Sequence, residues 1–222
     1  MKYRHRWLSG DRIDLPTGKI VCVGRNYAEH VEELNNPIPD DPVLFIKPVS
    51  SVVHLELPFN IPDDRGDVHF ETEIALLIDA PLTNASEQEA VAAIKAIGLA
   101  IDLTLRDLQF TLKSKGLPWE IAKSFDGSCP ISSFVAKEHL PDFDDIEFSL
   151  KVNGETRQQD TSAHMLTSIP GLLSFISRHF TLEPGDVVLT GTPKGVASLH
   201  NGDRLELAIH GIFSIETTCK SN

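Results

Sequence analysis

The stretch from His69 to Ile78 places the tightest constraint on how this chain can fold. Its second half, from Ile74 to Ile78, is continuously apolar and partly branched, which predicts a buried β-strand. Because alternate side chains of a strand point to opposite faces, Glu71 and Glu73 would project to the same side, just before that apolar run. Two carboxylates entering a core repel each other and lose hydration. A cation between them would remove both costs.

A second apolar run, from Ile97 to Leu103, contains the ionisable residue Asp102. A charge in such a run needs a partner. The small residues Gly98 and Ala100 lie on the same face and leave space beside the carboxylate. Three carboxylates without a cysteine cluster are typical ligands of a hard cation, which predicts Mg²⁺ or Mn²⁺ rather than Zn²⁺. An exposed strand whose two glutamates merely face water is the alternative.

Turn residues divide most of the remaining chain into short apolar runs, which indicates a β-rich protein. Strands are predicted at residues 19–23, 43–48, 148–152, 186–190, 204–209 and 212–218, and helices at 28–34, 87–96, 107–115 and 166–180. The dipeptide Asn153-Gly154 favours a tight hairpin turn, and residues 58–68 are predicted to form a loop. This pattern predicts an α+β fold with an N-terminal arm at 1–18 and one domain at 19–222.

The charge balance limits the classes of partner. The chain has 20 basic and 32 acidic residues and a net charge of −12, which argues against nucleic acid or an anionic membrane. No apolar run approaches the roughly 20 residues that span a bilayer. The three cysteines, Cys22, Cys129 and Cys219, show neither zinc-site spacing nor a disulfide framework. We therefore expect a cytoplasmic protein in a reducing compartment.

Two further groups have the chemistry of catalytic residues. His30 and Glu33 lie three residues apart on a predicted helix and therefore share one face. A carboxylate that orients an imidazole makes a general base near neutral pH. Lys123 has aromatic and aliphatic neighbours and could bind a substrate carboxylate or a developing oxyanion. The ordinary alternatives are an exposed His–Glu pair and a surface lysine whose alkyl chain covers apolar neighbours.

Three more polar residues are candidates for substrate binding. Arg106 and Gln109 follow Asp102 by four and seven residues, so they stay near it if the chain becomes helical there. The segment from Gly191 to Val196 follows a predicted strand but lacks the spacing of a nucleotide-binding phosphate loop. Its backbone N–H groups and the Thr192 hydroxyl can still bind a carboxylate.

Taken together, these segments resemble the fumarylacetoacetate hydrolase family, and in particular its short single-domain members of the acylpyruvase and oxaloacetate decarboxylase type. The matching segments are, in order, Gly24 to His30 with Glu33, Phe45 to Pro48, Glu71 with Glu73, Asp102 to Gln109, Lys115 to Asp126, Val152 to Gly154, and Thr190 to Val196. The resemblance implies a mixed β-roll with a few flanking helices, and usually a homodimer.

The resemblance also implies roles for individual residues. It implies Mg²⁺ or Mn²⁺ bound by Glu71, Glu73 and Asp102, a catalytic dyad of His30 and Glu33, and a substrate pocket lined by Arg25, Arg106, Gln109, Lys123 and Thr192. The expected substrate is a small 2-keto acid. Residues 19–222 would then be the catalytic domain.

We therefore expect a metal-dependent hydrolase that cleaves a carbon–carbon bond in acylpyruvate-type 2,4-diketo acids, giving pyruvate and a carboxylic acid. His30 would activate the attacking water and Lys123 would stabilise the oxyanion. Decarboxylation of oxaloacetate and isomerisation of a hydroxymuconate-type dioate share the same enolate and are the alternatives. A non-catalytic metal-bound binding module would explain the three carboxylates, but it leaves His30, Glu33 and Lys123 without a common purpose.

Overall fold

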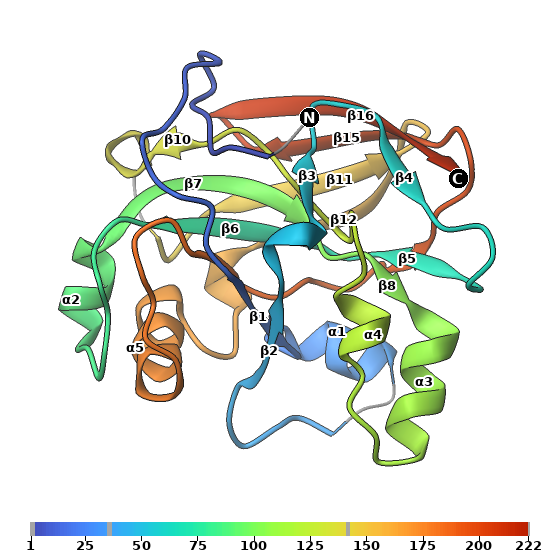
Figure 1. The fold of residues 1–222 in the computed structure, drawn as a ribbon, viewed down its shortest axis with the longest axis horizontal. Helices are drawn as coiled ribbons and strands as arrows, with labels where there is room; N and C mark the ends of the chain where they lie inside the picture. Colours follow the sequence, from blue (N-terminus) through green and yellow to red (C-terminus); the bar gives the residue numbers. More distant parts are fainter. Residues whose placement is uncertain (1–2, 35–36, 141–142, 222) are drawn as a thin grey trace.

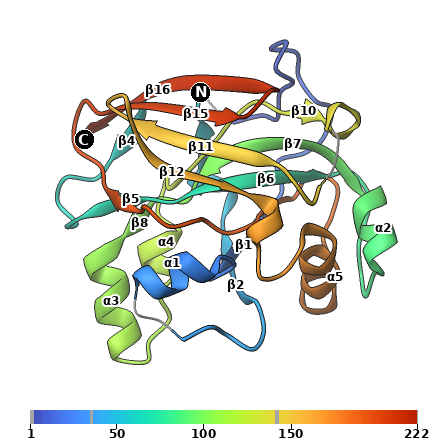
Figure 2. The same cartoon turned by 180° about the vertical axis from the view of Figure 1, so that it is seen from behind.

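The computed structural model describes residues 3–34, 37–140 and 143–221. Figures 1 and 2 show β-sheets stacked in the upper part of the molecule and α-helices gathered below them. The predicted β-rich α+β class is confirmed. Within the described residues, no helix is both long enough and apolar enough to cross a membrane.

The larger sheet contains the strand that was predicted to organise the fold. Its order is β2 (Val43–Lys47), β1 (Ile20–Gly24), β13 (Val187–Leu189), β6 (Thr72–Ile78), β7 (Ile94–Ile101), β9 (Cys129–Ile131) and β3 (Val52–His54), and β10 (Val135–Ala136) also pairs with β7. Strand β6 is therefore central and has a neighbour on each side.

Two further sheets complete the β-structure. The five-stranded sheet has the order β12 (Glu155–Thr161), β11 (Glu147–Val152), β15 (Arg204–Ile209), β16 (Phe213–Ser221) and β4 (Phe59–Ile61). The three-stranded sheet has the order β14 (Ala197–Ser198), β5 (Val68–Phe70) and β8 (Thr104–Leu105).

The helices are short. They are α1 (Ala28–Glu33), α2 (Glu87–Ala92), α3 (Arg106–Ser114), α4 (Glu120–Lys123) and α5 (Ile169–His179), with 3₁₀ turns at η1 (Val49–Ser51), η2 (Lys137–His139) and η3 (Ser162–His164). In both views α1, α3 and α4 lie together on one side and α2 and α5 on the other (Figures 1 and 2).

Strand β6 is continuously apolar because both of its faces are buried. Ile74, Leu76 and Ile78 belong to one core cluster, whereas Ala75 and Leu77 belong to a second cluster on the opposite face. A strand with a core on each side has no exposed face, so it shows no polar alternation. This is why the run between Glu73 and Asp79 is uninterrupted.

Local turn chemistry produces the predicted hairpin. Asn153 and Gly154 have φ values of 53° and 84°, the left-handed conformation that a tight primed turn requires at both central positions. The turn joins β11 to β12, which pair in antiparallel fashion.

Two sequence predictions differ most from the structure, and other element ends are shifted by one to three residues. Helix α2 begins at a capping box formed by Ser86 and Glu89 but ends at Ala92, not at residue 96. From Ile94 the chain is strand β7, because pairing with β6 outweighs the helix propensity of this alanine-rich segment. The predicted loop at 58–68 contains β4, a three-residue strand that pairs with β16 and is too short to show a clear periodic pattern.

The segment predicted as an N-terminal arm packs against the large sheet from residue 3 onward. Tyr3 and Ile13 are buried in the second core cluster. His5 is also buried, and its Nε2 lies 3.0 Å from the carbonyl oxygen of Gly185. These contacts fix residues 3–13 to the domain, and the division of the chain at residue 18 stays a prediction.

Candidate metal centre and active site

The antiparallel pairing of β6 with β7 brings the three predicted carboxylates together. Glu71 precedes β6, Glu73 lies in it, and Asp102 follows β7 by one residue. The N–H of Asp102 donates to the carbonyl oxygen of Glu71 at 2.8 Å, which aligns the two backbones. One carboxylate oxygen from each residue lies within 4.8 Å of the other two, and all three residues are buried. Burial excludes the alternative of an exposed strand.

Two of these carboxylates already have cationic partners. Lys123 Nζ lies 2.6 Å from Glu71 Oε2 and 2.6 Å from Asp102 Oδ2. Arg106 Nη2 lies 2.5 Å from Glu71 Oε1. Burial alone would raise the pKa of Glu71, but the charges of Lys123 and Arg106 outweigh it and hold that pKa well below its usual range.

Glu73 is in a different position, because its carboxylate has a backbone partner and no adjacent cation among the described residues. Its Oε2 accepts from the N–H of Gly191 at 2.6 Å. Burial, followed by the negative charges of Asp102 and Glu71, raises the pKa of Glu73 well above its ordinary value. An added cation would relieve this repulsion. The three oxygen donors therefore fit a hard divalent ion such as Mg²⁺ or Mn²⁺.

Lys47 is a member of this charge cluster that sequence reasoning did not assign to the site. It lies at the end of β2 with no exposed surface, and its Nζ is 2.8 Å from Asp102 Oδ1. The same Nζ is 3.1 Å from both oxygens of Ser128 and also contacts the carbonyl oxygen of Lys123. A lysine at the end of an apolar strand was the signal that could have identified it, because a buried lysine requires a paired acid.

Helix α1 presents the predicted His–Glu pair. His30 is buried, and its Nδ1 lies 3.3 Å from Glu33 Oε2. Because a carboxylate only accepts, Nδ1 carries the hydrogen and Nε2 is left with a free lone pair. Burial lowers the pKa of His30 below its usual value, although Glu71 and Glu33 oppose the shift. A neutral imidazole with one free nitrogen is suited to accept a proton.

A backbone contact holds Glu33 from the other side. Both carboxylate oxygens of Glu33 accept from the N–H of Gly195, at 3.0 and 3.2 Å. Next to this contact, Lys194 Nζ lies 2.9 Å from Glu29 Oε2, an exposed pair of little energetic weight. Gly195 has a φ of 98°, and a Cβ there would lie 1.9 Å from the carbonyl oxygen of Arg157. Only glycine fits at this close approach.

Gly195→Ala is expected to destabilise the protein more than Gly154→Ala does. Both glycines have positive φ, so each alanine costs about 1–2 kcal/mol in backbone strain. A Cβ at Gly154 meets no atom within 4 Å, whereas a Cβ at Gly195 collides with Arg157, which adds about 1–3 kcal/mol. Urea unfolding of the two variants measures the difference. Equal destabilisation would contradict the close approach.

A cavity of about 160 Å³ lies beside these groups. Six of the predicted site residues line it, namely Arg25, His30, Glu71, Arg106, Gln109 and Lys123. Phe45, Trp119 and Lys113 also line the cavity and were not predicted to do so. Its walls come from β2, α1, α3 and α4, so residues far apart in the sequence meet here. Arg25 has a φ of 65°, an uncommon conformation for a side-chain-bearing residue and one that is concentrated at functional sites.

Hydrogen bonds fix the side chains of three predicted substrate-binding residues, Arg106, Gln109 and Thr192. Arg106 Nη1 donates to Gln109 Oε1 at 2.8 Å, as expected for residues three apart on α3. Thr192 follows Gly191, which contacts Glu73, but Thr192 does not line the cavity itself. Its hydroxyl accepts from Gln158 Nε2 at 2.8 Å. Gln158 was not predicted from the sequence.

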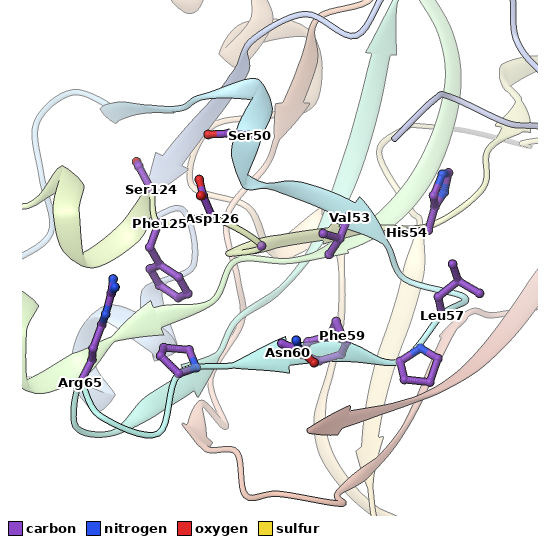
Figure 3. A pocket seen from close by; sticks show the side chains of 13 residues that line it. Ser50, Val53, His54, Leu57, Phe59, Asn60, Arg65, Ser124, Phe125 and Asp126 are labelled. Atoms are coloured by element: carbon purple, nitrogen blue, oxygen red, sulfur yellow. The ribbon is translucent and has the colours of Figure 1, made fainter. Parts of the chain in front are cut away.

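A larger hollow of about 710 Å³ lies elsewhere, between β3 and β4 (Figure 3). His54, Asn60, Arg65 and Asp126 are among the residues that line it. Figure 3 shows that these side chains come from separate segments and do not converge on one point. Volume alone therefore does not identify the chemical site, and the smaller cavity beside the carboxylates is the candidate.

The sequence of this chain matches one protein family and several characterised relatives. The family described as fumarylacetoacetate (FAA) hydrolase C-terminal matches residues 19–220. Oxaloacetate tautomerase YcgM of Escherichia coli (strain K12) is 49% identical over 210 residues, which cover 94% of this chain and 96% of the relative.

Two solved structures superpose over nearly the whole chain. A fumarylacetoacetate hydrolase family protein from Yersinia pestis CO92 has a TM-score of 0.96 at 47% identity, covering 98% of this chain and 100% of its own. A fumarylpyruvate hydrolase from Pseudomonas aeruginosa, in complex with Mn²⁺ and pyruvate, has a TM-score of 0.93 at 31% identity, covering 100% and 97%.

Proposed function

Because this chain belongs to the fumarylacetoacetate hydrolase family, we propose that it is a Mg²⁺- or Mn²⁺-dependent enzyme that interconverts the enol and keto forms of oxaloacetate or a similar short 2-oxo dicarboxylic acid. The observation that carries this proposal is the lining of the 160 Å³ cavity. The lining combines one buried imidazole with four cationic side chains and one carboxylate, Glu71, which pairs with two of those cations, and the cavity is small. The similarity to a protein named as an oxaloacetate tautomerase supports the same substrate class.

The cationic side chains match a dianionic substrate. Arg25, Arg106, Lys113 and Lys123 all line the cavity of a chain whose net charge is −12. Burial, and then the positive charges of Arg25 and Arg106, lower the pKa of Lys113 below its usual value. Crowded cations of this kind are relieved by a bound anion. Locally concentrated positive charge also attracts an anion that the rest of the surface repels.

The proposed reaction moves one proton, shifts the double bond between C2=C3 and C2=O, and cleaves no carbon–carbon bond. In the enol-to-keto direction, the enol hydroxyl loses a proton and C3 gains one. His30 is the group suited to carry that proton, since Nε2 is free while Glu33 holds Nδ1–H. Lys123 and Arg106 line the cavity, and their positive charges would stabilise negative charge on substrate oxygens. A divalent ion held by the three carboxylates would add Lewis-acid stabilisation of charge on the 2-oxo group.

Hydrolysis of a short acylpyruvate is the second candidate function. The observation that favours it is the His30–Glu33 pair, since an oriented imidazole is also what water activation requires. The similarity to a fumarylpyruvate hydrolase points in the same direction. The small cavity would restrict such a substrate to a short acyl group. Decarboxylation of oxaloacetate remains a third outcome of the same assay.

A single assay distinguishes these reactions. Purified protein with Mg²⁺ or Mn²⁺ is given enol-form oxaloacetate, equilibrated oxaloacetate or acetylpyruvate, and products are followed by proton NMR. We expect enol decay faster than the spontaneous rate, suppressed by a chelator and restored by added metal. Free metal without protein is the control, because metal ions alone accelerate these reactions. Unchanged enol decay together with release of acetate and pyruvate from acetylpyruvate would replace the tautomerase proposal with the hydrolase.

Two further properties belong to this proposal. We propose that the enzyme acts in the cytoplasm, which agrees with the three buried free cysteines Cys22, Cys129 and Cys219. We also propose that it forms a homodimer. Phe110 and Ile121 are 75% and 63% exposed, and a second copy would cover apolar surface of this kind.

A further inference from the structure

Gln158 is a buried polar residue whose position calls for a functional explanation. It is 1% exposed, whereas the other residues of β12 are exposed or partly exposed. The pairing of β12 with β11 shifts at this point, since Leu150 pairs with Gln158 and Lys151 pairs with Thr156. Arg157 is therefore an extra residue, which makes a β-bulge. Bulges redirect the adjoining side chains and are frequent next to active sites.

The Gln158 side chain joins the metal-ligand strand to the loop that follows β13. Its Oε1 accepts from the N–H of Thr72, the residue between Glu71 and Glu73, at 2.9 Å. Its Nε2 donates to the carbonyl oxygen of Pro193 at 2.8 Å and to Thr192 Oγ1 at 2.8 Å.

These partners determine the orientation of the amide. The N–H of Thr72 can only donate, and the carbonyl of Pro193 can only accept. The amide oxygen must therefore face Thr72, and the amide nitrogen must face Thr192 and Pro193. Both hydrogens of the nitrogen are used, so the hydroxyl oxygen of Thr192 is an acceptor in this contact.

This arrangement controls the remaining hydrogen of the Thr192 hydroxyl. A hydroxyl has one hydrogen to donate, and it cannot donate back to an NH₂ group whose lone pair is delocalised. Within the described residues, the Thr192 hydroxyl has no acceptor for this hydrogen. Thr192 is 4% exposed and adjoins Gly191, whose N–H bonds Glu73. A buried donor is therefore available on the Glu73 side of the carboxylate centre, outside the residues that line the 160 Å³ cavity.

We propose that Gln158 is a positioning residue that keeps the Thr192 hydroxyl oriented as a hydrogen-bond donor to an anionic oxygen of a substrate that extends from the cavity to the Glu73 side of the carboxylate centre. The inference rests on the proposed function for the class of ligand, an anionic 2-oxo acid. Gln158 acts through Thr192 and does not itself touch the ligand. Because a donor to a charged group contributes about 1.5–3 kcal/mol, its loss weakens binding by about 10- to 100-fold.

A double-mutant cycle tests this coupling by binding rather than by turnover. The probe is oxamate, an unreactive isostere of a 2-oxo acid, titrated into Mn²⁺-loaded protein by calorimetry. Gln158→Met and Thr192→Val are each expected to weaken oxamate binding about tenfold or more. The double variant should bind within about twofold of Thr192→Val alone, because the two residues act as one unit.

Three comparisons separate positioning from a merely structural role. Gln159→Met changes an exposed glutamine of the same strand and should bind oxamate as the native protein does. Gln158→Glu keeps an acceptor for Thr72 but makes the other side-chain oxygen an acceptor for the Thr192 hydroxyl, so oxamate binding should still weaken. Mn²⁺ affinity and thermal unfolding are measured on every variant, because the buried carboxylate of Gln158→Glu would also face the carbonyl oxygen of Pro193 and lower the thermal midpoint.

The possible results distinguish a failure of the role proposed for Gln158 from a failure of the proposed function. Additive losses in the double variant, or native oxamate binding by Gln158→Glu, would overturn the role of Gln158 while leaving the proposed function intact. Equal losses of Mn²⁺ and oxamate affinity in both Gln158 variants would also overturn it, in favour of a structural role. Native Mn²⁺-loaded protein that binds no oxamate would instead overturn the proposed substrate class, and this inference with it.

Discussion

Glu73→Gln is expected to reduce metal affinity and turnover severely while raising the stability of the metal-free protein. Glu73 is 1% exposed and has two carboxylate neighbours, Glu71 and Asp102. Glutamine keeps the size of the side chain and an oxygen that can accept from Gly191, but it removes the charge. Metal-free protein would lose a buried repulsion, and metal-loaded protein would lose a ligand.

Glu73→Gln should weaken metal binding and turnover but stabilise the metal-free protein, and this combination makes the prediction specific. Mn²⁺ affinity should fall by more than about a hundredfold, since even residues that only support a metal ligand typically contribute 10–100-fold. Turnover should fall on the order of a thousandfold, because Lewis-acid stabilisation supplies several kcal/mol. The thermal midpoint of the metal-free protein should rise. Calorimetric Mn²⁺ titration, thermal unfolding with a chelator and the enol-decay assay measure these quantities.

Glu147→Gln provides the matched control. Glu147 begins β11 and is exposed, so the same change should leave metal affinity, turnover and stability nearly unaffected. A metal-free Glu73→Gln protein that unfolds at a lower temperature than the native protein, with unchanged Mn²⁺ affinity, would show that Glu73 is a structural acid rather than a metal ligand.

His30→Asn is expected to lower turnover by about 10²–10⁴-fold, the usual contribution of a general acid–base group. The substitution removes Nε2, the free nitrogen of a 5% exposed imidazole that Glu33 orients. Mn²⁺ affinity should remain close to that of the native protein, since His30 is not among the three clustered carboxylates. Turnover in the enol-decay assay and a Mn²⁺ titration of the same samples provide both readings.

The pH dependence of the rate gives an independent test of His30. A base must be neutral to act, and burial lowers the pKa of His30 below its ordinary value of about 6.5. The kcat/KM of the native enzyme should therefore persist as the pH falls through about 6.5 and decline only below it. His30→Asn should lack this acidic limb.

His164→Asn is the control for this histidine prediction. His164 also contacts a carboxylate, with its Nδ1 2.7 Å from Asp160 Oδ1, but its side chain is 71% exposed and lies outside the cavity. Turnover and the pH profile should be those of the native enzyme. A His30→Asn variant within about threefold of native turnover would remove His30 from the proposed role.

Sequence patterns predicted those features that depend only on residues close together in the chain. The carboxylates at Glu71, Glu73 and Asp102 were recognisable because charges interrupt or adjoin apolar runs. The pair at His30 and Glu33 follows from helical spacing, which the structure reproduces in α1. The hairpin at 153–154 follows from a turn that asparagine and glycine favour.

Contacts between segments far apart in the sequence decided the features that the sequence patterns did not predict. Residues 94–96 have the composition of a helix and form a strand, because β6 offers a hydrogen-bonding partner that local propensity cannot represent. Lys47 belongs to the charge cluster only because β2 ends beside Asp102, 55 residues further along the chain. The residues next to a strand in the sequence do not identify the strand that it pairs with. In the same way, the residues next to a buried lysine do not identify the acid that it pairs with.

The sequence by itself therefore determined which residues are able to carry the chemistry, namely the oxygen ligands, the oriented imidazole and the cationic side chains. Only the tertiary structure decided how they are combined. It gives Glu71 direct contacts with two cations and Glu73 a backbone partner, it closes a small cavity around His30, and it turns Gln158 inward at a β-bulge. The physical reason is that burial and charge pairing depend on distance in space, whereas sequence patterns report only neighbours along the chain.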